Sequence, residues 1–268
     1  MPNGKVIAHY PGNKSVKGLY HLIINNIPPH KHYYELFAGS AEIARRKAPA
    51  QLNVINDVNK KVYRKLLKYS VQHPELGWNV MNDSVLNFLP LFTDTKKVSK
   101  ADFIYLDPPY LDCDVYEQGH EYYFHKSILQ YLVKLPCNIM ISHYEHPVYD
   151  ELLQIGWRKK TFETYYRRKY VVEAIYMNYP EPEKLHDYSF LGADCWERQL
   201  MKRRLNGYLK GLRSLSVVER SRIIEAINKE FTLATTENFT VAAANLLHPG
   251  STAKITVPAR AKTKPVVQ

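Results

Sequence analysis

Short apolar runs alternate with longer helical stretches over the first 180 residues, and this alternation is the feature that most limits how the chain can fold. The runs that predict strands are 33–37, 52–56, 78–81, 103–106 and 138–142. Because parallel strands need a crossover connection, usually a helix, the pattern predicts an α/β fold with a mostly parallel sheet. The last two apolar segments, roughly 157–165 and 170–179, are joined by a basic turn and predict an antiparallel hairpin at the sheet edge.

The tetrapeptide Asp107-Pro108-Pro109-Tyr110 follows the fourth predicted strand. Two consecutive prolines can neither donate to a β-ladder nor enter a helix interior, so the strand should end at Leu106. A following proline also restrains the residue before it, which makes the Asp107 carboxylate and the Pro108 carbonyl fixed acceptors beside the Tyr110 ring. Two rigid acceptors and a flat ring suit a planar substrate that carries an NH2 group, such as a nucleobase. The alternative is an ordinary proline turn that begins at an aspartate.

Other predicted strands also end at residues suited to a ligand site. Ala38-Gly39-Ser40-Ala41 is a small-residue turn before a helix, typical of nucleotide-binding units, although only Gly39 is glycine. Asp57 follows the second strand and is placed either to bind ribose hydroxyls or to cap the next helix. Asp83, followed by Ser84, is placed either to accept from an adenine amino group or to cap a helix. Since ligands bind across the carboxyl ends of such strands, we expect one cleft lined by Gly39, Asp57, Asp83 and Asp107.

A glycine turn, Tyr10-Pro-Gly-Asn-Lys-Ser15, precedes a helical pattern that extends to Ile27. Backbone N–H groups at a helix start, together with the Lys14 ammonium, are suited to bind an anion. A plain helix start would show the same pattern.

Composition favours a nucleic-acid partner. The formal net charge is +11, with 37 Lys and Arg against 26 Asp and Glu, and the 21 tyrosines supply rings on which bases can stack. The three cysteines lack metal-ligand spacing, so we expect a reducing compartment, no zinc, and buried thiols at Cys137 and Cys195. The sequence shows neither a membrane-length apolar run nor a signal-peptide pattern, so we expect a soluble, cytoplasmic protein, either monomer or dimer.

Two basic clusters lie on the predicted hairpin. One consists of Arg158, Lys159 and Lys160, and the other of Arg167, Arg168 and Lys169. We interpret them as a phosphate-contacting surface, with a solvated hairpin tip as the equally weighted alternative.

Composition changes at Pro180-Glu-Pro182, which predicts a domain at 1–180, a basic helical extension at 181–231 and a largely flexible tail at 232–268. The extension should contain helices near 196–212 and 217–231, the second opened by a capping box of Ser216 and Glu219. Two such helices permit a helix-turn-helix-like DNA reader, but their amphipathic pattern favours packing onto the main domain.

In their order, these motifs resemble the Dam-like class of adenine-specific DNA methyltransferases over roughly residues 6–180. The resemblance is carried by Tyr10–Ser15, Glu35-Leu-Phe-Ala-Gly-Ser40, Ile55-Asn-Asp57, Asp107–Tyr110 and the strand from Glu173 to Tyr179. It implies a Rossmann-like methyltransferase sheet, S-adenosylmethionine as the cofactor and DNA as the partner.

By this resemblance, the cofactor's methionine end would lie near Tyr10, Lys14 and Gly39, its ribose on Asp57, and its adenine between Phe37 and Asp83-Ser84. The target adenine would be flipped out of the duplex, stacked on Tyr110, and held through its amino group by Asp107 and the Pro108 carbonyl. Methyl transfer to N6 would be direct and in line, without a covalent enzyme intermediate.

The chain departs from that class in one respect that concerns specificity. Members usually insert a target-recognition domain before the catalytic motif, whereas only a short stretch separates Asp83 from Asp107. We therefore expect a short or relaxed target site, read by the loop 116–124, the hairpin or the C-terminal helices. The alternatives are an RNA adenine methyltransferase and a catalytically silent nucleic-acid-binding protein; the intact Asp107 and Tyr110 favour an enzyme.

Overall fold

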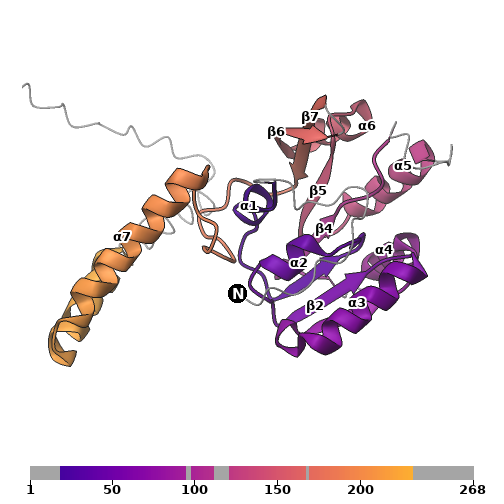
Figure 1. Ribbon diagram of the computed structural model, residues 1–268. Coiled ribbons are helices and arrows are strands. Elements are labelled where there is room, and N and C mark those ends of the chain that lie inside the picture. Colours follow the sequence, from indigo (N-terminus) through magenta and orange to yellow (C-terminus); the bar gives the residue numbers. More distant parts are fainter. Residues whose placement is uncertain (1–18, 95–97, 112–120, 167–168, 232–268) are drawn as a thin grey trace, which may run out of the picture. The chain divides into compact units, whose positions relative to one another are not determined.

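A seven-stranded sheet forms the centre of the first of two compact units, which ends at Met201 (Figure 1). The computed structural model describes residues 19–94, 98–111, 121–166 and 169–231. The strands are β1 (His32–Glu35), β2 (Leu52–Asn56), β3 (Trp78–Met81), β4 (Asp102–Leu106), β5 (Asn138–Tyr144), β6 (Arg158–Tyr166) and β7 (Lys169–Met177). Their spatial order is β3-β2-β1-β4-β5-β7-β6.

The strands β1 to β5 are parallel to one another, and β7 is antiparallel to both β5 and β6. This arrangement confirms the predicted Rossmann-like α/β fold with an antiparallel edge hairpin. Because β1, β2 and β4 lie in the middle of the sheet, helices cover both of their faces, and the five residues of β4 are all buried. The carboxyl ends of β1 to β5 consequently meet at one edge.

Helices pack on both faces of this sheet (Figure 1). On one face, α1 (Leu19–Ile24), α2 (Glu42–Arg46) and α3 (Lys60–Gln72) enclose a core that contains Tyr33 and Phe103. On the other, α4 (Val85–Asp94), α5 (Glu121–Leu132) and α6 (Pro147–Asp150) enclose a core that contains Ile104 and Leu106. The short 3-10 helices η1 (Pro74–Leu76) and η2 (Glu151–Ile155) complete the connections. Alternate residues of β4 thus point into opposite cores, as the twofold period of a strand requires.

The first turn of α3 shows which polar residue caps the helix. The Asn59 side chain accepts a hydrogen bond from the Lys61 N–H at 2.9 Å, while Asp57 accepts from the Asn59 N–H instead. The alternative in which Asp57 caps the helix is therefore wrong, because Asn59 is the N-cap. Asparagine is as good a capping residue as aspartate, and Val58 and Asn59 lie between Asp57 and the helix.

The second unit begins at Lys202 and is described on its own. It contains most of α7 (Cys195–Arg213) and a further helix at 217–231. The predicted capping box is confirmed, because the Glu219 N–H donates to Ser216 Oγ at 3.3 Å and the Ser216 N–H donates to Glu219 Oε2 at 2.9 Å.

The cysteines differ in burial. Cys137 is buried as predicted, and burial raises the pKa of its thiol to about 12. Cys195 is exposed, so its predicted burial is wrong; it lies on α7, which has no buried residue among those described. Within the described ranges, no helix is long and apolar enough to cross a membrane. Nor do three His, Cys, Asp or Glu side chains of those ranges gather into a group that could hold a metal ion.

Candidate active site

The turn after β1 lies beside the acid that follows β2. The Gly39 N–H donates to Asp57 Oδ2 at 2.8 Å, and the Asn59 N–H donates to Oδ1 at 2.8 Å. Burial raises the pKa of the Asp57 carboxyl, and these two hydrogen bonds oppose that rise. A carboxylate offers about four acceptor positions, so two stay available for a ligand such as a ribose. The structure thus brings together Gly39 and Asp57, as the sequence predicts.

The turn itself requires left-handed backbone at two positions. Gly39 has φ +50°, and Ala41 has φ +50° and ψ +42°. Glycine adopts this region without strain, whereas alanine does so at some cost. The small side chains at 38–41 allow a ligand to approach the backbone closely. The N–H groups of Ala38, Gly39 and Ala41 already donate within the protein, to the Asn56 carbonyl, Asp57 Oδ2 and the Ala38 carbonyl.

Asn56 is a residue of this site that sequence reasoning missed. It is buried at 1% exposure. Its Nδ2 donates to the Leu36 carbonyl at 3.1 Å and to the Asp83 carbonyl at 2.9 Å, and its Oδ1 accepts from the Asp83 N–H at 3.0 Å. One side chain therefore ties together the chain segments that leave β1, β2 and β3. The sequence feature that could have identified Asn56 is its position at the end of β2, next to Asp57.

Asp83 and Ser84 open α4. Asp83 Oδ1 accepts from the Ser84 N–H at 2.7 Å and from Asn87 Nδ2 at 2.7 Å, and Ser84 Oγ accepts from the Leu86 N–H at 3.3 Å. The helix cap is therefore Ser84, directly before α4, and the alternative in which Asp83 caps this helix is wrong. Asp83 is also exposed at the carboxyl end of β3, so contact with an adenine amino group stays a prediction.

Asp107 follows β4 at the centre of the edge. Glu35 pairs with Tyr105 between β1 and β4, so Phe37 and Asp107 each follow this pair by two residues along the chain. The Phe37 ring contacts Phe124 of α5, with centroids 6.2 Å apart and an interplanar angle of 81°. Phe37 therefore lies on the α5 side of the cleft, and its predicted contact with the cofactor adenine stays a prediction.

The Tyr110 ring is held from two directions. Its hydroxyl donates to Glu173 Oε2 of β7 at 3.0 Å, and its ring meets that of Tyr144 edge to face with centroids 4.5 Å apart. Burial, followed by the charges of Asp107 and Glu173, keeps the pKa of the Tyr110 hydroxyl well above its usual value. The hydroxyl is therefore a hydrogen-bond donor at any working pH, and its bond to Glu173 fixes the ring orientation.

His143 ties the catalytic turn to β5. Its Nε2 accepts from the Leu111 N–H at 2.9 Å, so Nδ1 carries the proton and donates to the Tyr144 carbonyl at 2.9 Å. The ring is fully buried. A neutral histidine with both nitrogens engaged positions the residue after Tyr110 and supplies no free base. His143 and Tyr144 are the last residues of β5. Like Asp107, they could have been proposed as site residues from their position at the carboxyl end of a predicted strand.

We expect the Tyr110 ring to matter more for activity than its hydroxyl. Tyr110→Phe keeps the stacking surface and loses one hydrogen bond, so kcat should fall by less than about tenfold. Tyr110→Ala removes a stacking platform worth about 1–3 kcal/mol per base, so methyl transfer should fall by roughly 10- to 100-fold. Steady-state methylation kinetics of both variants check this, and an equal loss in both would assign the main role to the hydroxyl.

A buried acid, Glu35, ends β1, and a buried base, Lys47, follows α2. Glu35 Oε2 accepts from the Tyr33 hydroxyl at 2.9 Å and from the Ala44 N–H at 3.0 Å. Burial, together with the Asp107 charge, raises the pKa of Glu35 to about 8 against these two bonds. Burial lowers the pKa of Lys47 to about 7. The Lys47 ammonium lies 4.0 Å from the centre of the Tyr33 ring.

The raised pKa of Glu35 should make the free energy of unfolding decrease as the pH rises. Its carboxyl binds a proton in the folded protein up to about pH 8 but loses it near pH 4.5 when unfolded, so the folded state is favoured below pH 4.5 and progressively less favoured up to pH 8. Glu35→Gln mimics the protonated carboxyl and should gain stability relative to wild type over this window, by a few kcal/mol at the upper end. Urea unfolding at several pH values measures the difference; the exposed Glu163→Gln serves as control. A constant difference between Glu35→Gln and wild type would contradict the assignment.

The structure separates the two predicted basic clusters. Arg158 donates to Glu181 at 2.7 Å, Lys160 lies 3.4 Å from the same carboxylate, and Lys159 pairs with Glu145 at 2.8 Å. Arg158 pairs with Met177 in the sheet, at the end far from Asp107, whereas β6 and β7 continue past the end of β5 on the side of Asp107. The first cluster therefore pairs with exposed acids in the structure. Contact of either cluster with phosphates stays a prediction.

Several predicted residues lie outside the described ranges or have undescribed side chains. Tyr10 and Lys14 fall before Leu19, the loop 116–124 is described only from Glu121, and Arg167 and Arg168 fall in the gap at the tip. Lys169 is described only as part of β7. Their roles stay predictions.

The family match covers the sheet edge. A family described as "Conserved hypothetical protein 95" matches residues 7–164, more than half of the 268-residue chain. The chain belongs to this family. The matched region contains all of β1 to β5 and so every strand end discussed above. The family description names no substrate, so the Dam-like resemblance, which does, goes further than the match.

Several solved structures align with this chain at low sequence identity. A human methyltransferase 10 domain containing protein is 14% identical over 56% of this chain and 73% of its own, with a TM-score of 0.43. TrmN from Thermus thermophilus is 14% identical over 58% and 46%, with a TM-score of 0.42. TrmK from M. capricolum, solved with S-adenosylhomocysteine, is 12% identical over 78% and 93%, with a TM-score of 0.42. No curated protein matches the sequence.

Proposed function

We propose that this chain transfers a methyl group from S-adenosylmethionine to N6 of adenine in DNA. The observation that carries the proposal is the position of Asp107-Pro108-Pro109-Tyr110 at the end of β4. On one side lie the Gly39 turn and Asp57, and on the other lie the aromatic rings at the end of β5 and Glu173 in the middle of β7. A cofactor subsite and a base subsite therefore share one catalytic turn.

The residues on the β1 to β3 side fit the cofactor. Asp57 keeps acceptor positions for ribose hydroxyls, and the small residues 38–41 leave room for a ligand at the backbone. When bound, S-adenosylmethionine supplies a methyl group activated on a positively charged sulfur. The Asp107 carboxylate is well suited to lie beside that charge, although the chain as a whole carries +11.

The residues on the β5 and β7 side fit a flipped base. Tyr110 offers a ring whose orientation is fixed by Glu173 and Tyr144, so stacking costs little additional order. Asp107 and the Pro108 carbonyl are rigid acceptors for the two hydrogens of an exocyclic amino group. Those bonds shift electron density onto a nitrogen whose lone pair is otherwise delocalised into the ring.

The chemistry asked of these residues is orientation and placed charge. As the nitrogen gains the methyl group, it becomes positively charged and then releases one of the protons held by Asp107. The carboxylate stabilises that developing charge and is positioned to receive the proton. No residue of the chain needs to form a covalent bond.

An isotope experiment tests the proposal. Duplex DNA and single-stranded RNA are incubated separately with the protein and S-adenosylmethionine carrying a deuterated methyl group, and the digested nucleosides are resolved by mass spectrometry. Label in N6-methyldeoxyadenosine supports the proposal. Label in RNA alone would show an RNA methyltransferase, and binding of both nucleic acids without any label would show a silent binding protein.

A further inference from the structure

The part of α7 that lies beyond Met201 carries cations and no acid. From Lys202 to Val218 the sequence contains Lys202, Arg203, Arg204, Lys210 and Arg213 and neither aspartate nor glutamate. Lys202, Lys210 and Arg213 are exposed. We propose that this basic face of α7 binds the sugar-phosphate backbone of the DNA substrate.

The cations gather on one side of the helix. At about 100° per residue, Lys202, Arg203, Lys210 and Arg213 fall within an arc of roughly 100°, with Asn206 among them. At a rise of about 1.5 Å per residue, they extend over roughly 16 Å of the helix axis. A row of positive side chains of this length spans several phosphates of one DNA strand.

The opposite side of the same segment is apolar. Tyr208 and Leu212 of α7 line one common groove with Ile223 and Ile227 of the helix 217–231. On the helical wheel, Tyr208 and Leu212 lie roughly opposite the centre of the basic arc. The pairing of the two helices therefore occupies the apolar side and leaves the basic face turned outward.

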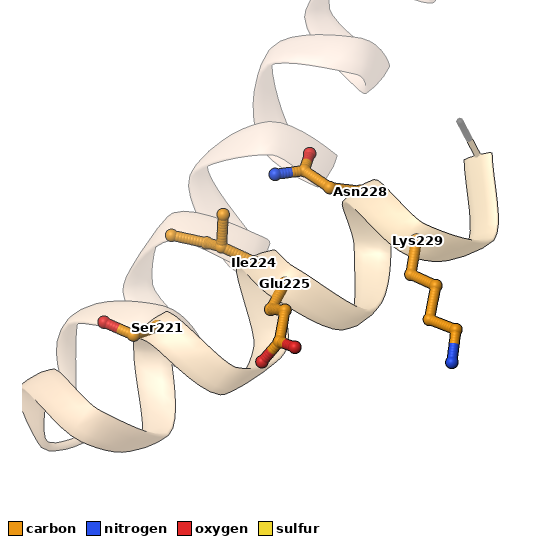
Figure 2. A pocket seen from close by; sticks show the side chains of 5 residues that line it. All are labelled: Ser221, Ile224, Glu225, Asn228 and Lys229. Carbon is orange, nitrogen blue, oxygen red and sulfur yellow. The ribbon is translucent and has the colours of Figure 1, made fainter. Parts of the chain in front are cut away.

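The companion helix 217–231 lacks such a face. Its cations Arg220, Arg222 and Lys229 alternate with Glu219, Glu225 and Glu230. Arg222 lies 3.3 Å from Glu225, and Figure 2 shows Glu225 and Lys229 both projecting from this helix. Alternating signs are typical of a solvated helix surface, so the one-signed face of α7 needs a different explanation.

Charge complementarity selects the occupant. A cationic row with an amide among the cations matches phosphate oxygens, and the overall charge of +11 adds long-range attraction to a polyanion. The choice of DNA rests on the function proposed above. In the first unit, Arg158, Lys159 and Lys160 already pair with acids. The cations of α7 are therefore better placed than these three residues to bind phosphates.

Two triple variants of the full chain test the inference. One carries Lys202→Gln, Lys210→Gln and Arg213→Gln; its matched control carries Arg220→Gln, Arg222→Gln and Lys229→Gln, so both lose the same charge. Binding to fluorescent duplex DNA is measured by anisotropy over a range of salt concentrations. We expect Kd for the first variant to rise on the order of tenfold to hundredfold, and the slope of log K against log salt to shrink by about 2–3. The control should change by less than about threefold.

Equal losses in the two variants would overturn the inference, because net charge alone would then explain them, and so would unchanged binding in both. Loss of binding to RNA or to vesicles of anionic lipid, with DNA binding intact, would assign the face to another partner and overturn it too. A charge-preserving variant, Lys202→Arg with Lys210→Arg and Arg213→Lys, guards against misfolding and should bind like wild type.

Methyl transfer separates this inference from the proposed function. If the wild type methylates DNA and the first variant binds as well as the control, the α7 inference fails and the proposed function stands. If the wild type binds DNA through this face but transfers no methyl group, the proposed function fails and the inference stands. With both correct, the first variant raises KM for DNA and leaves kcat at saturating DNA within about twofold of wild type.

Discussion

Replacing Asp107 with alanine is expected to lower kcat for methyl transfer by roughly 10²- to 10³-fold, the largest effect on activity of any single change considered for this chain. The reason is that Asp107 supplies the charged acceptor to the reacting amino group, and loss of one preorganised group that stabilises developing charge has an effect of that size. The rest of the cleft should persist, since β4 is buried between β1 and β5 and ends before Asp107.

The variant Asp107→Asn sharpens this test. The amide keeps the shape of the carboxylate and can still accept one hydrogen bond through its oxygen, but it carries no charge and cannot take up the proton. Its kcat should lie between those of wild type and Asp107→Ala, while Kd for DNA stays within about threefold of wild type in both variants. Single-turnover kinetics combined with anisotropy measure the two quantities separately. Full activity of Asp107→Ala would remove this residue from the reaction.

Replacing Asn56 with alanine is expected to have the largest effect on the cofactor side. The change removes the hydrogen bond from Asn56 to the Leu36 carbonyl and both hydrogen bonds between Asn56 and the backbone of Asp83. The Asn56 side chain that makes these bonds is buried. Each buried polar group left without a partner costs about 1–3 kcal/mol, so the free energy of unfolding should fall by roughly 2–4 kcal/mol. Affinity for the cofactor should also fall, because the ends of β1, β2 and β3 are no longer held together.

Asn79→Ala provides the matched control. Asn79 lies on the neighbouring strand β3, is the same residue type, and is exposed, so its replacement should change stability by less than about 0.5 kcal/mol. Urea unfolding with and without S-adenosylhomocysteine measures both properties at once, since ligand binding to the folded state adds to stability. If Asn56→Ala were as stable as Asn79→Ala, the three hydrogen bonds would not be holding the strand ends.

Most of the sheet could be predicted from local patterns. Strand 52–56 was predicted with its observed bounds, because a buried apolar run between polar turns is a signal contained in a few residues. Strand 78–81 was predicted from its apolar residues, although the residues of this strand alternate between half-buried and exposed. The cleft followed from the same patterns: in a parallel sheet the carboxyl ends meet at one edge, which is why Gly39 and Asp57 are hydrogen bonded although they lie on different turns.

Contacts that depend on the edge hairpin could not be predicted in this way. Glu173 lies in the middle of β7, where no turn or strand end marks it, and it reaches Tyr110 only because β7 pairs with β5 in the register that sets Glu173 opposite Tyr144. The acid that pairs with Arg158, Glu181, lies 23 residues away in sequence and outside the strands. Long-range register, which local propensity does not encode, decides the contact of Glu173 with Tyr110.

Sequencing of DNA from cells that express the protein, with detection of modified bases, tests the central claim most directly. The host should lack its own adenine methylation, and cells expressing Asp107→Ala provide the background. We predict N6-methyladenine at a short or degenerate site in cells with the wild-type protein and none in cells with Asp107→Ala. Unmodified DNA in both, with both proteins folded and expressed, would contradict the proposal that this site methylates adenine in DNA.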